Sequence, residues 1–458
     1  MNSTTATIAQ FITSTQPESA PTGAFESAQR TLIDTLGVAL AGLSDPSAPL
    51  VDQWLSTVGG TPSCTVWGRT SGASVAEAAF ANGVRAHALD FDDSLPSLNG
   101  HPSSVIWPAA LAAGELTDSS GQDVLWAYIL GLEVAGKLGR AVGSGHYTKG
   151  WHPTATIGVF SATAAAGRLM QLTSEQMQTA LGIAASQASG LICNFGTMTK
   201  PLHVGHAARN GIMATLLAKS GFTANTTIFD VNRGFLEVYA GADGPSMTEL
   251  VNELGSKWEI CNPGIYVKRW PCCYCTYRPI GGVLDFLNNR QIRAEDIIEI
   301  RVGFPPGTAD ALITETPTNG VAAKFSTAYV LAALIVDREL SLATFTDEQI
   351  CRPDIKRLMA KIKSYDVEDS NIYNANVGYT ELAISTQSEN YKVRVERTPG
   401  SPQWPVTNED LKDKFHLCCD EVAGRAHAAE ILSAADQCRD LTSIRKLTAL
   451  LSFKPKSK

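Results

Sequence analysis

The chain has 458 residues, of which 44% are hydrophobic and 18% charged, and its formal net charge is −8. This length favours two or three domains, and the apolar fraction argues against disorder. The acidic balance argues against nucleic acid or an anionic membrane surface as the main partner. No apolar run approaches the ~20 residues of a membrane span, and no basic start of a secretory signal precedes the N-terminal apolar residues. We expect a cytoplasmic protein, with mitochondria as the alternative location.

The first half of the chain predicts a bundle of helices rich in Ala and Gly. Apolar residues recur at helical spacing, and two N-termini carry a capping-box pattern, Ser74 with Glu77 and Thr173 with Gln176. The helices that this spacing predicts are Phe25–Leu43, one from Ser74 into His87, Val124–Val142, Thr156–Leu172 and Thr173–Ser189.

Beyond Lys268 the pattern changes to the alternation typical of strands. Strands are predicted at 296–304, 379–386 and 391–396, and the last two form a hairpin. Helices are predicted at 322–337, 347–364, 408–423 and 428–438. The fold is therefore expected to be mainly α with a second, α+β domain. A large helical bundle built from both chain ends, residues 1–267 and 403–458, would hold a smaller inserted α+β domain, residues 268–402.

Acids and histidines gather in the segment HALDFDDSLPSLNGHPSS, residues 87–104, among turn-forming residues. Such a loop, following a helical run, is typical of an active site held on a scaffold. One Asp would orient a histidine, and His101 would act as the base. The alternative is that Asp90, Asp92 and Asp93 only cap helices and accept backbone hydrogen bonds.

Two further segments place histidines and cations near helix starts. In KGWHPTATIG, His152 stands at the entrance of an apolar helix, whose positive end favours a neutral base, although a buried hydrogen bonder is equally expected there. In GTMTKPLHVGHAARNG, Lys200 precedes a proline and is expected on an extended turn, followed by His203, His206 and Arg209. These cationic groups need an anion to offset their charge, unless they form a solvated basic face.

A fourth segment, YVKRWPCCYCTYRP, mixes Lys268, Arg269 and Arg278 with aromatic residues. A cleft lined by such cations suits a small ligand with several carboxylates, and the alternative is a solvated basic edge. So short a run in an acidic chain argues against nucleic acid. The cysteines in C-C-Y-C lack the spacing of zinc or iron–sulfur ligands, so we expect reduced thiols and no metal.

The sequence contains no glycine-rich phosphate loop, no G-x-S-x-G turn and no H-E-x-x-H helix. The candidate groups that are left are His, Asp, Lys and Tyr side chains without an evident cofactor. They suit proton transfer next to a carboxylate, as in dehydration, epimerisation or decarboxylation.

The chain resembles the MmgE/PrpD family over nearly its whole length. The resemblance is carried by HALDFDDS, GHPSSVIWPAALAAGE, GWHPTATIG, TKPLHVGHAARNG, VKRWPCC and AKFSTAYVLA. Members include 2-methylcitrate dehydratase, cis-aconitate decarboxylase and iminodisuccinate epimerase. The resemblance implies a helical domain from both chain ends with an α+β insertion, a homodimer, and activity without metal or organic cofactor.

Carried over by motif, the resemblance implies a pocket formed by Asp90, Ser94, His101, His152, Lys200, Lys268 and Tyr329. His101 and His152 would be the acid and base, and Asp90 would orient a histidine. Carboxylates would be bound by Lys200, Lys268 and Arg278, with Ser94 and His203 also binding substrate. Tyr329 would donate a hydrogen bond or relay a proton. Many relatives carry a histidine near the position of Arg278, so its guanidinium suggests an altered carboxylate grip.

The preferred interpretation is a lyase that acts on a citrate-like polycarboxylate, with dehydration of a 2-alkylcitrate favoured. The alternatives are decarboxylation of cis-aconitate to itaconate, and epimerisation of a dicarboxylate such as iminodisuccinate. A non-catalytic ligand binder is disfavoured, because a binder does not need both an acid and a base.

Overall fold

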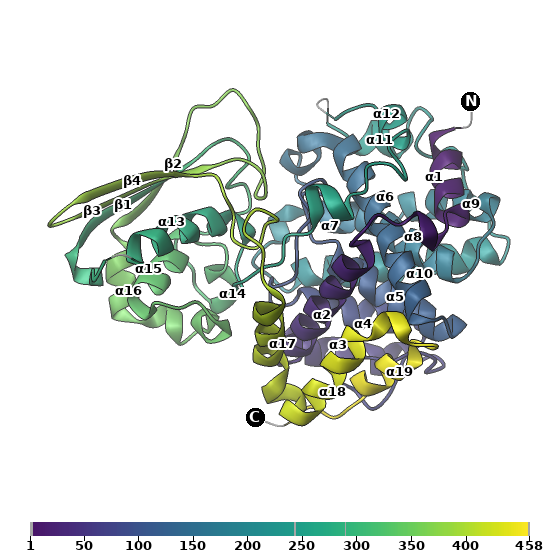
Figure 1. Cartoon of the computed structure of the whole chain (residues 1–458). Helices are drawn as coiled ribbons and strands as arrows, with labels where there is room; N and C mark the ends of the chain where they lie inside the picture. Colours follow the sequence, from purple (N-terminus) through teal and green to yellow (C-terminus); the bar gives the residue numbers. More distant parts are fainter. Residues whose placement is uncertain (1–2, 242–243, 289, 457–458) are drawn as a thin grey trace.

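The protein consists of a large helical body beside a smaller body of strands and helices (Figure 1). The computed structural model describes residues 3–241, 244–288 and 290–456. None of the helices in these ranges is long and apolar enough to cross a membrane. The predicted fold class, mainly α with a smaller α+β part, is confirmed.

The large body contains helices from both ends of the chain, and α17 packs against α2. Its helices are α1 (Thr4–Ser14), α2 (Ala24–Ala41), α3 (Ser47–Val58), α4 (Val75–His87), α5 (Ser103–Thr117), α6 (Gly121–Thr148), α7 (Pro153–Thr156), α8 (Gly158–Leu169), α9 (Ser174–Ala185), α10 (Thr199–Lys219), α11 (Phe235–Tyr239), α12 (Met247–Val251), α17 (Asn408–Ala423), α18 (Arg425–Asp436) and α19 (Arg445–Thr448).

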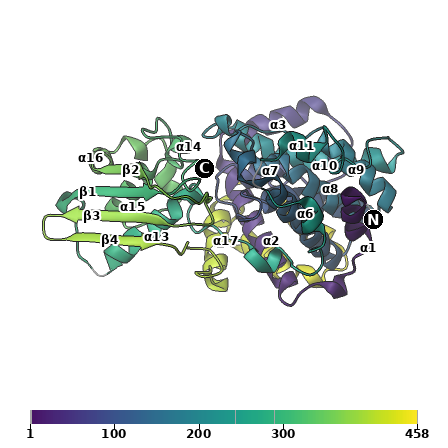
Figure 2. The same ribbon diagram turned by 90° about the horizontal axis from the view of Figure 1, so that it is seen from above.

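The smaller body is a four-stranded mixed sheet with helices on one face (Figures 1 and 2). The strand order is β2-β1-β3-β4, with β1 parallel to β2 and the other pairs antiparallel. Side chains of β3 alternate between buried and half-buried, as expected of a strand covered on one face. The elements are β1 (Ile297–Phe304), β2 (Ile362–Asp366), β3 (Thr380–Thr386), β4 (Asn390–Val395), α13 (Tyr277–Asn288), α14 (Gly320–Ala323), α15 (Thr327–Asp337) and α16 (Pro353–Met359).

Each body has its own buried apolar cluster. The first cluster runs from Ile8 to Val267 and resumes from Val406 to Leu451. The second runs from Tyr266 to Ile384. The boundaries after residues 267 and 402 are our proposal for where the chain passes from one body to the other.

Two glycines let helices α4 and α10 cross at close range. A Cβ atom on Gly83 would lie 2.8 Å from Gly205 Cα, and one on Gly205 would lie 2.4 Å from the carbonyl oxygen of Phe80. Any side chain at either position would force the two helices apart. This crossing brings the loop that follows α4 beside the first turn of α10.

Most predicted elements are present, and the two capping boxes differ. Thr173 and Gln176 form the predicted reciprocal box at the start of α9. The box predicted at Ser74 is wrong: Ser74 is the N-cap residue of α4, but its side chain accepts no capping hydrogen bond. Glu77 instead accepts from Arg209 Nε at 2.7 Å, so a tertiary ion pair replaces the local cap.

The α+β part shows two larger corrections. The helix predicted over 347–364 is wrong at both ends, because α16 covers only Pro353–Met359 and Ile362 then pairs with Ile300 in the sheet. The helix predicted over 322–337 is interrupted between α14 and α15, where Ser326 caps α15 by accepting from Tyr329 N. The predicted hairpin is confirmed, since β3 and β4 pair antiparallel.

Candidate active site

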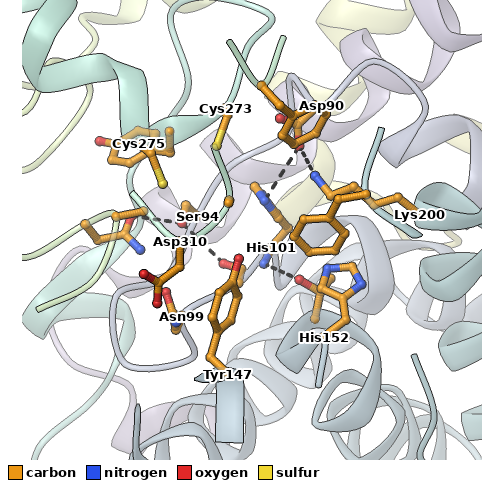
Figure 3. A pocket seen from close by; sticks show the side chains of 18 of the residues that line it. Asp90, Ser94, Asn99, His101, Tyr147, His152, Lys200, Cys273, Cys275 and Asp310 are labelled. Atoms are coloured by element: carbon orange, nitrogen blue, oxygen red, sulfur yellow. Dashed lines mark hydrogen bonds and ion pairs between the residues drawn. The ribbon is translucent and has the colours of Figure 1, made fainter. Parts of the chain in front are cut away.

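A narrow cavity lies where the two bodies meet, and Figure 3 shows the side chains that line it. Its volume, counted as the space that the centre of a water molecule can reach, is about 50 Å³, which holds a few waters. The helical body contributes Asp90, Ser94, Asn99, Gly100, His101, Tyr147, His152, Thr154, Phe195 and Lys200, and the α+β side contributes Cys273, Tyr274, Cys275, Gly307, Asp310, Ala311, Phe325, Ala375 and Asn376.

Asp90 is the anionic centre of this site and follows α4 with a left-handed backbone, φ 52°. Lys200 Nζ lies 2.5 Å from Asp90 Oδ1 (Figure 3), and Lys268 Nζ lies 3.2 Å from Oδ2. Lys268 also donates to the Asp90 carbonyl at 2.6 Å. Burial alone would raise the pKa of Asp90, but the two lysines outweigh it and hold this pKa well below its usual value. The carboxylate therefore stays charged and offsets the two buried cations.

Lys200 lies in the first turn of α10, so the extended turn predicted for it is wrong. Pro201 is tolerated next to it because N–H groups in a first helical turn have no intrahelical partner. The Lys200 ammonium lies 4.9 Å from the ring centre of Phe195 and 4.8 Å from that of Phe325. These rings shield the ammonium from water and leave it available to an anion in the cavity.

His101 has a defined hydrogen pattern. Its Nδ1 lies 2.7 Å from the carbonyl oxygen of Asp93, and a carbonyl can only accept, so Nδ1 carries the hydrogen. Nε2 lies 3.8 Å from Asp90 Oδ1. Burial lowers the pKa of His101 to about 3, with Asp92 opposing this effect and Lys268 adding to it. A neutral His101 thus keeps a lone pair on Nε2 and can act as a base.

His152 is the N-cap residue of the short helix α7, as the sequence predicts. Its Nδ1 lies 3.2 Å from Nδ1 of His203. The Phe195 ring packs edge-on against the His152 ring, with 4.8 Å between the ring centres. Burial, with Lys200 next in size, holds the pKa of His152 well below its usual value. Two neutral imidazoles, His101 and His152, therefore line the same cavity.

A second acid–histidine pair lies behind these two rings. His87 Nδ1 lies 2.8 Å from Asp92 Oδ2, and both side chains are fully buried. The His87 ring centre is 4.9 Å from that of His101. We predict that Asp90 orients a histidine: its Oδ1 lies 3.8 Å from His101 Nε2, beyond direct hydrogen-bond distance, whereas Asp92 contacts His87 directly.

The other predicted site residues have mixed positions. Ser94 lines the cavity, and its hydroxyl donates to Asn376 Oδ1 at 2.9 Å. Arg278 is buried one layer behind the wall, where it donates to the carbonyl oxygen of Ala375 at 3.1 Å. The structure does not bring Tyr329 to the described lining: its hydroxyl donates to the carbonyl oxygen of Thr344 at 2.5 Å. Tyr329 is therefore placed as a buried structural contact.

Sequence reasoning missed much of the wall on the α+β side. Cys273, Cys275, Ala311, Phe195 and Phe325 form a small apolar cluster of their own beside the cavity. Asp310 and Asn376 come from loops without a sequence pattern that signals a site. Cys273 and Cys275 lie in the segment YVKRWPCCYCTYRP and Phe325 lies in AKFSTAYVLA, but the sequence assigns none of the three a role at the site.

The side chains that lie closest to a metal-binding arrangement are His87, Asp92 and His101, whose donor atoms lie within 4.8 Å of one another in the described part of the chain. His101 Nδ1 is occupied by a hydrogen that it donates to Asp93, and His87 Nδ1 faces Asp92. Lys268 lies close enough to act on the pKa values of Asp92 and His101. This donor set does not fit a cation.

Neutral imidazoles and buried ammonium groups around one cavity define an acid–base site for an anionic substrate. Comparison with known proteins identifies the family. Residues 6–248 match the MmgE/PrpD N-terminal domain, and residues 270–440 match the MmgE/PrpD C-terminal domain. The chain belongs to the MmgE/PrpD family.

Curated relatives align over nearly the whole chain. Cis-aconitate decarboxylase of Mus musculus is 28% identical over 446 residues, which are 94% of this chain and 89% of that protein. The Homo sapiens protein of the same name is 27% identical over 92% of this chain and 89% of its own length. Cis-aconitate decarboxylase of Aspergillus terreus is 27% identical over 99% of this chain and 96% of its own length.

Proposed function

We propose that this protein is a lyase that acts on a citrate-like polycarboxylate and removes CO₂ from a cis-aconitate-like acid. The observation that carries the proposal is the pair His101 and His152, two imidazoles that line one cavity with the ammonium of Lys200. The names of the curated relatives move our preferred reaction from dehydration to decarboxylation. No cofactor enters the proposed reaction.

The apolar part of the wall also favours decarboxylation. A carboxylate against Ala311 and Cys275 would be poorly solvated, whereas the CO₂ that it becomes is neutral. Lys200 and Ser94, which line the cavity, would hold the carboxylates that stay. Lys268 acts from behind the wall by keeping Asp90 charged.

The chemical step needs one proton. The bond between the departing carboxylate and its methylene carbon breaks, and its electron pair forms the new double bond to the central carbon. His152 takes up a proton from solvent as the trianion binds, and the electron pair of the original double bond takes this proton from the imidazolium at the other carbon. A trianion and one proton thus give an itaconate dianion and CO₂.

Dehydration of a 2-alkylcitrate is the second candidate, because the Nε2 lone pair of His101 offers the base that this reaction also needs. The base would take the proton next to a carboxylate, and His152 would protonate the departing hydroxyl. Epimerisation of a dicarboxylate would use the same two histidines without loss of a group.

Proton NMR of the purified enzyme with cis-aconitate, 2-methylcitrate, citrate and iminodisuccinate tests the proposal. We expect the methylene signals of itaconate from cis-aconitate. A vinyl signal from methylcitrate would establish the dehydratase instead, and deuterium exchange in D₂O without a new product would establish the epimerase. No change with any of the four acids would contradict the proposed activity.

The variants His152→Ala and Lys200→Ala are expected to lower turnover by about two orders of magnitude or more with the fold intact. The matched control is His416→Ala, which removes a half-exposed histidine paired with Asp420 on α17, away from the described cavity lining. Near-normal turnover in both site variants would refute the assignment of these residues.

The homodimer and the cytoplasmic location that the sequence led us to expect are proposals. Light scattering of the purified protein tests the first, and a mass near twice that of one chain is the expected result. Imaging of the tagged protein in its own cells tests the second.

A further inference from the structure

The contact between His152 and His203 joins two ring nitrogens at hydrogen-bond distance. Nδ1 of one ring lies 3.2 Å from Nδ1 of the other. Two such nitrogens form a hydrogen bond only when one carries a hydrogen and the other offers a lone pair. One ring therefore fixes the tautomer of the other.

The backbone is shaped to allow this contact. Gly190 has φ +133°, and a Cβ atom there would lie 3.4 Å from His152 Cβ and 3.4 Å from His203 Cγ. The Gly190 carbonyl accepts the backbone N–H of His152 at 3.0 Å. A residue with a side chain rarely adopts this φ, so a glycine is favoured at the position where the chain passes beside both histidines.

His203 does not touch the cavity among the described residues that line it, whereas His152 does. The residue is 9% exposed and sits one helical turn after Lys200 on α10. Burial lowers the pKa of His203 to about 4, helped by His87, His206 and Lys200. At neutral pH His203 is uncharged and has a lone pair to offer.

We propose that His203 is a positioning residue for His152: its Nδ1 accepts a hydrogen bond from Nδ1–H of His152 and so directs Nε2 of His152 to carry the catalytic proton. The inference rests on the proposed acid role of His152, and it replaces the substrate-binding role expected for His203. His101 has the same arrangement, with the Asp93 carbonyl as acceptor. Both imidazoles then present Nε2 to the cavity.

The acceptor also supports the charged form of His152 after a polyanionic substrate has bound. A neutral acceptor stabilises the Nδ1–H of an imidazolium without cancelling its charge, so the proton on Nε2 stays acidic enough to transfer. The groups that face or lie near the His152 ring are His87 at the end of α4, His101 in the next loop, Lys200 and His203 on α10, and Phe195. Of these groups, His203 is the one whose side chain lies at hydrogen-bond distance from a ring nitrogen of His152 in the described part of the chain.

Three substitutions at one position test the proposal. His203→Leu removes the acceptor and is expected to lower kcat at least tenfold while KM changes less than threefold. His203→Asn keeps an acceptor oxygen near the place of Nδ1 and is expected to restore most of the loss. His203→Asp places a charged acceptor there and is expected to move the alkaline limb of the kcat profile upward by about one pH unit.

His206→Leu is the matched control, because it removes a half-buried histidine one turn further along the same helix. Its kcat and pH profile are expected to match those of the unchanged protein. Unchanged kcat in His203→Leu, or a raised KM at normal kcat, would overturn the proposal, and the latter would return His203 to substrate binding. Loss in all three variants without a shift of the pH profile would show a packing role only, which also overturns it.

Nitrogen NMR of the imidazoles separates this inference from the proposed reaction. His152 is expected to be the Nδ1–H tautomer, and His203→Leu is expected to convert part of it to the Nε2–H tautomer. This result is independent of turnover. An inactive unchanged protein would refute the proposed function, whereas the tautomer of His152 alone would decide whether His203 accepts its hydrogen bond. An Nε2–H tautomer of neutral His152 in the unchanged protein would overturn the inference.

Discussion

Substitution of Asp90 by Asn tests whether the charge of this carboxylate holds the site together. The carboxylate faces Lys200 Nζ at 2.5 Å and Lys268 Nζ at 3.2 Å, and the two lysine side chains are 6% and 0% exposed. Removal of one partner from a buried ion pair costs about 3–5 kcal/mol, because the other charge is left without compensation. Asn keeps the volume and one acceptor, so we expect Asp90→Asn to lower the free energy of unfolding by about 3 kcal/mol, which is a roughly 150-fold loss in the folded-to-unfolded ratio.

Asp93→Asn is the matched control for this experiment. Burial, reinforced by Asp34, raises the pKa of Asp93 well above its usual value, so its neutral form is favoured and Asn mimics it. The free energy of unfolding of Asp93→Asn is expected to fall by less than about 1 kcal/mol. Urea unfolding at pH 7, followed by circular dichroism, compares the midpoints of the two variants with that of the unchanged protein.

The pH dependence of the difference has a defined sign. The pKa of Asp90 is lower in the folded than in the unfolded protein, so its stabilisation is present above the usual value of 3.8 and is lost as pH falls below it. The gap between the unchanged protein and Asp90→Asn should therefore be constant from pH 5 to 8 and shrink below about pH 4. Equal losses in the two variants, or no loss in Asp90→Asn, would refute the reasoning.

Three further predictions concern protonation and burial. Binding of a polycarboxylate should take up protons, because His101, with a pKa of about 3, is neutral until an anion arrives; calorimetry in buffers of different ionisation enthalpy should show this uptake, and affinity should rise as pH falls. Burial, opposed by Lys137, raises the pKa of Glu133 to about 7, so the stability that its neutral form contributes is lost as pH rises from about 4.5 to 7. This loss amounts to roughly 3 kcal/mol in the free energy of unfolding. Thermal melts of Glu133→Gln should therefore not show this decrease of stability with pH. Tyr329→Phe should change kcat less than twofold and lower the free energy of unfolding by about 1 kcal/mol, because only the hydrogen bond to Thr344 is lost; a large fall in kcat would place Tyr329 at the site.

The sequence predicts those parts of the fold that depend on local periodicity. The helix 408–423 and the hairpin of β3 and β4 follow directly from spacing and alternation. Strand β2 could not be found in this way, because its five residues follow a short helix, and their strand form depends on pairing with β1. Tertiary pairing overrides a weak local preference here.

For the candidate site too, the sequence predicts features that depend on residue type and does not predict contacts that depend on tertiary packing. The segment 87–104 and His152 stand out by residue type, and the structure brings them together with Lys200. The contact of Asp90 with Lys200 depends on the crossing of α4 and α10, which a pattern in the chain does not encode. Asp90 therefore lies closest to two lysines and Asp92 to His87, whereas our sequence analysis predicts that Asp90 orients a histidine and that the lysines bind substrate carboxylates.

The two walls of the cavity have different tasks, and this has a consequence for how such proteins diversify. The imidazoles, the Asp90 carboxylate and the Lys200 ammonium are supplied by the helical body, while loops around Asp310 and Asn376 close the cavity from the α+β side. Loop residues change at little cost to a helical core. One set of proton-transfer groups can thus serve acids of different shape when only the opposite wall is altered, so exchange of the 305–319 loop between relatives should transfer substrate preference and leave the proton chemistry in place.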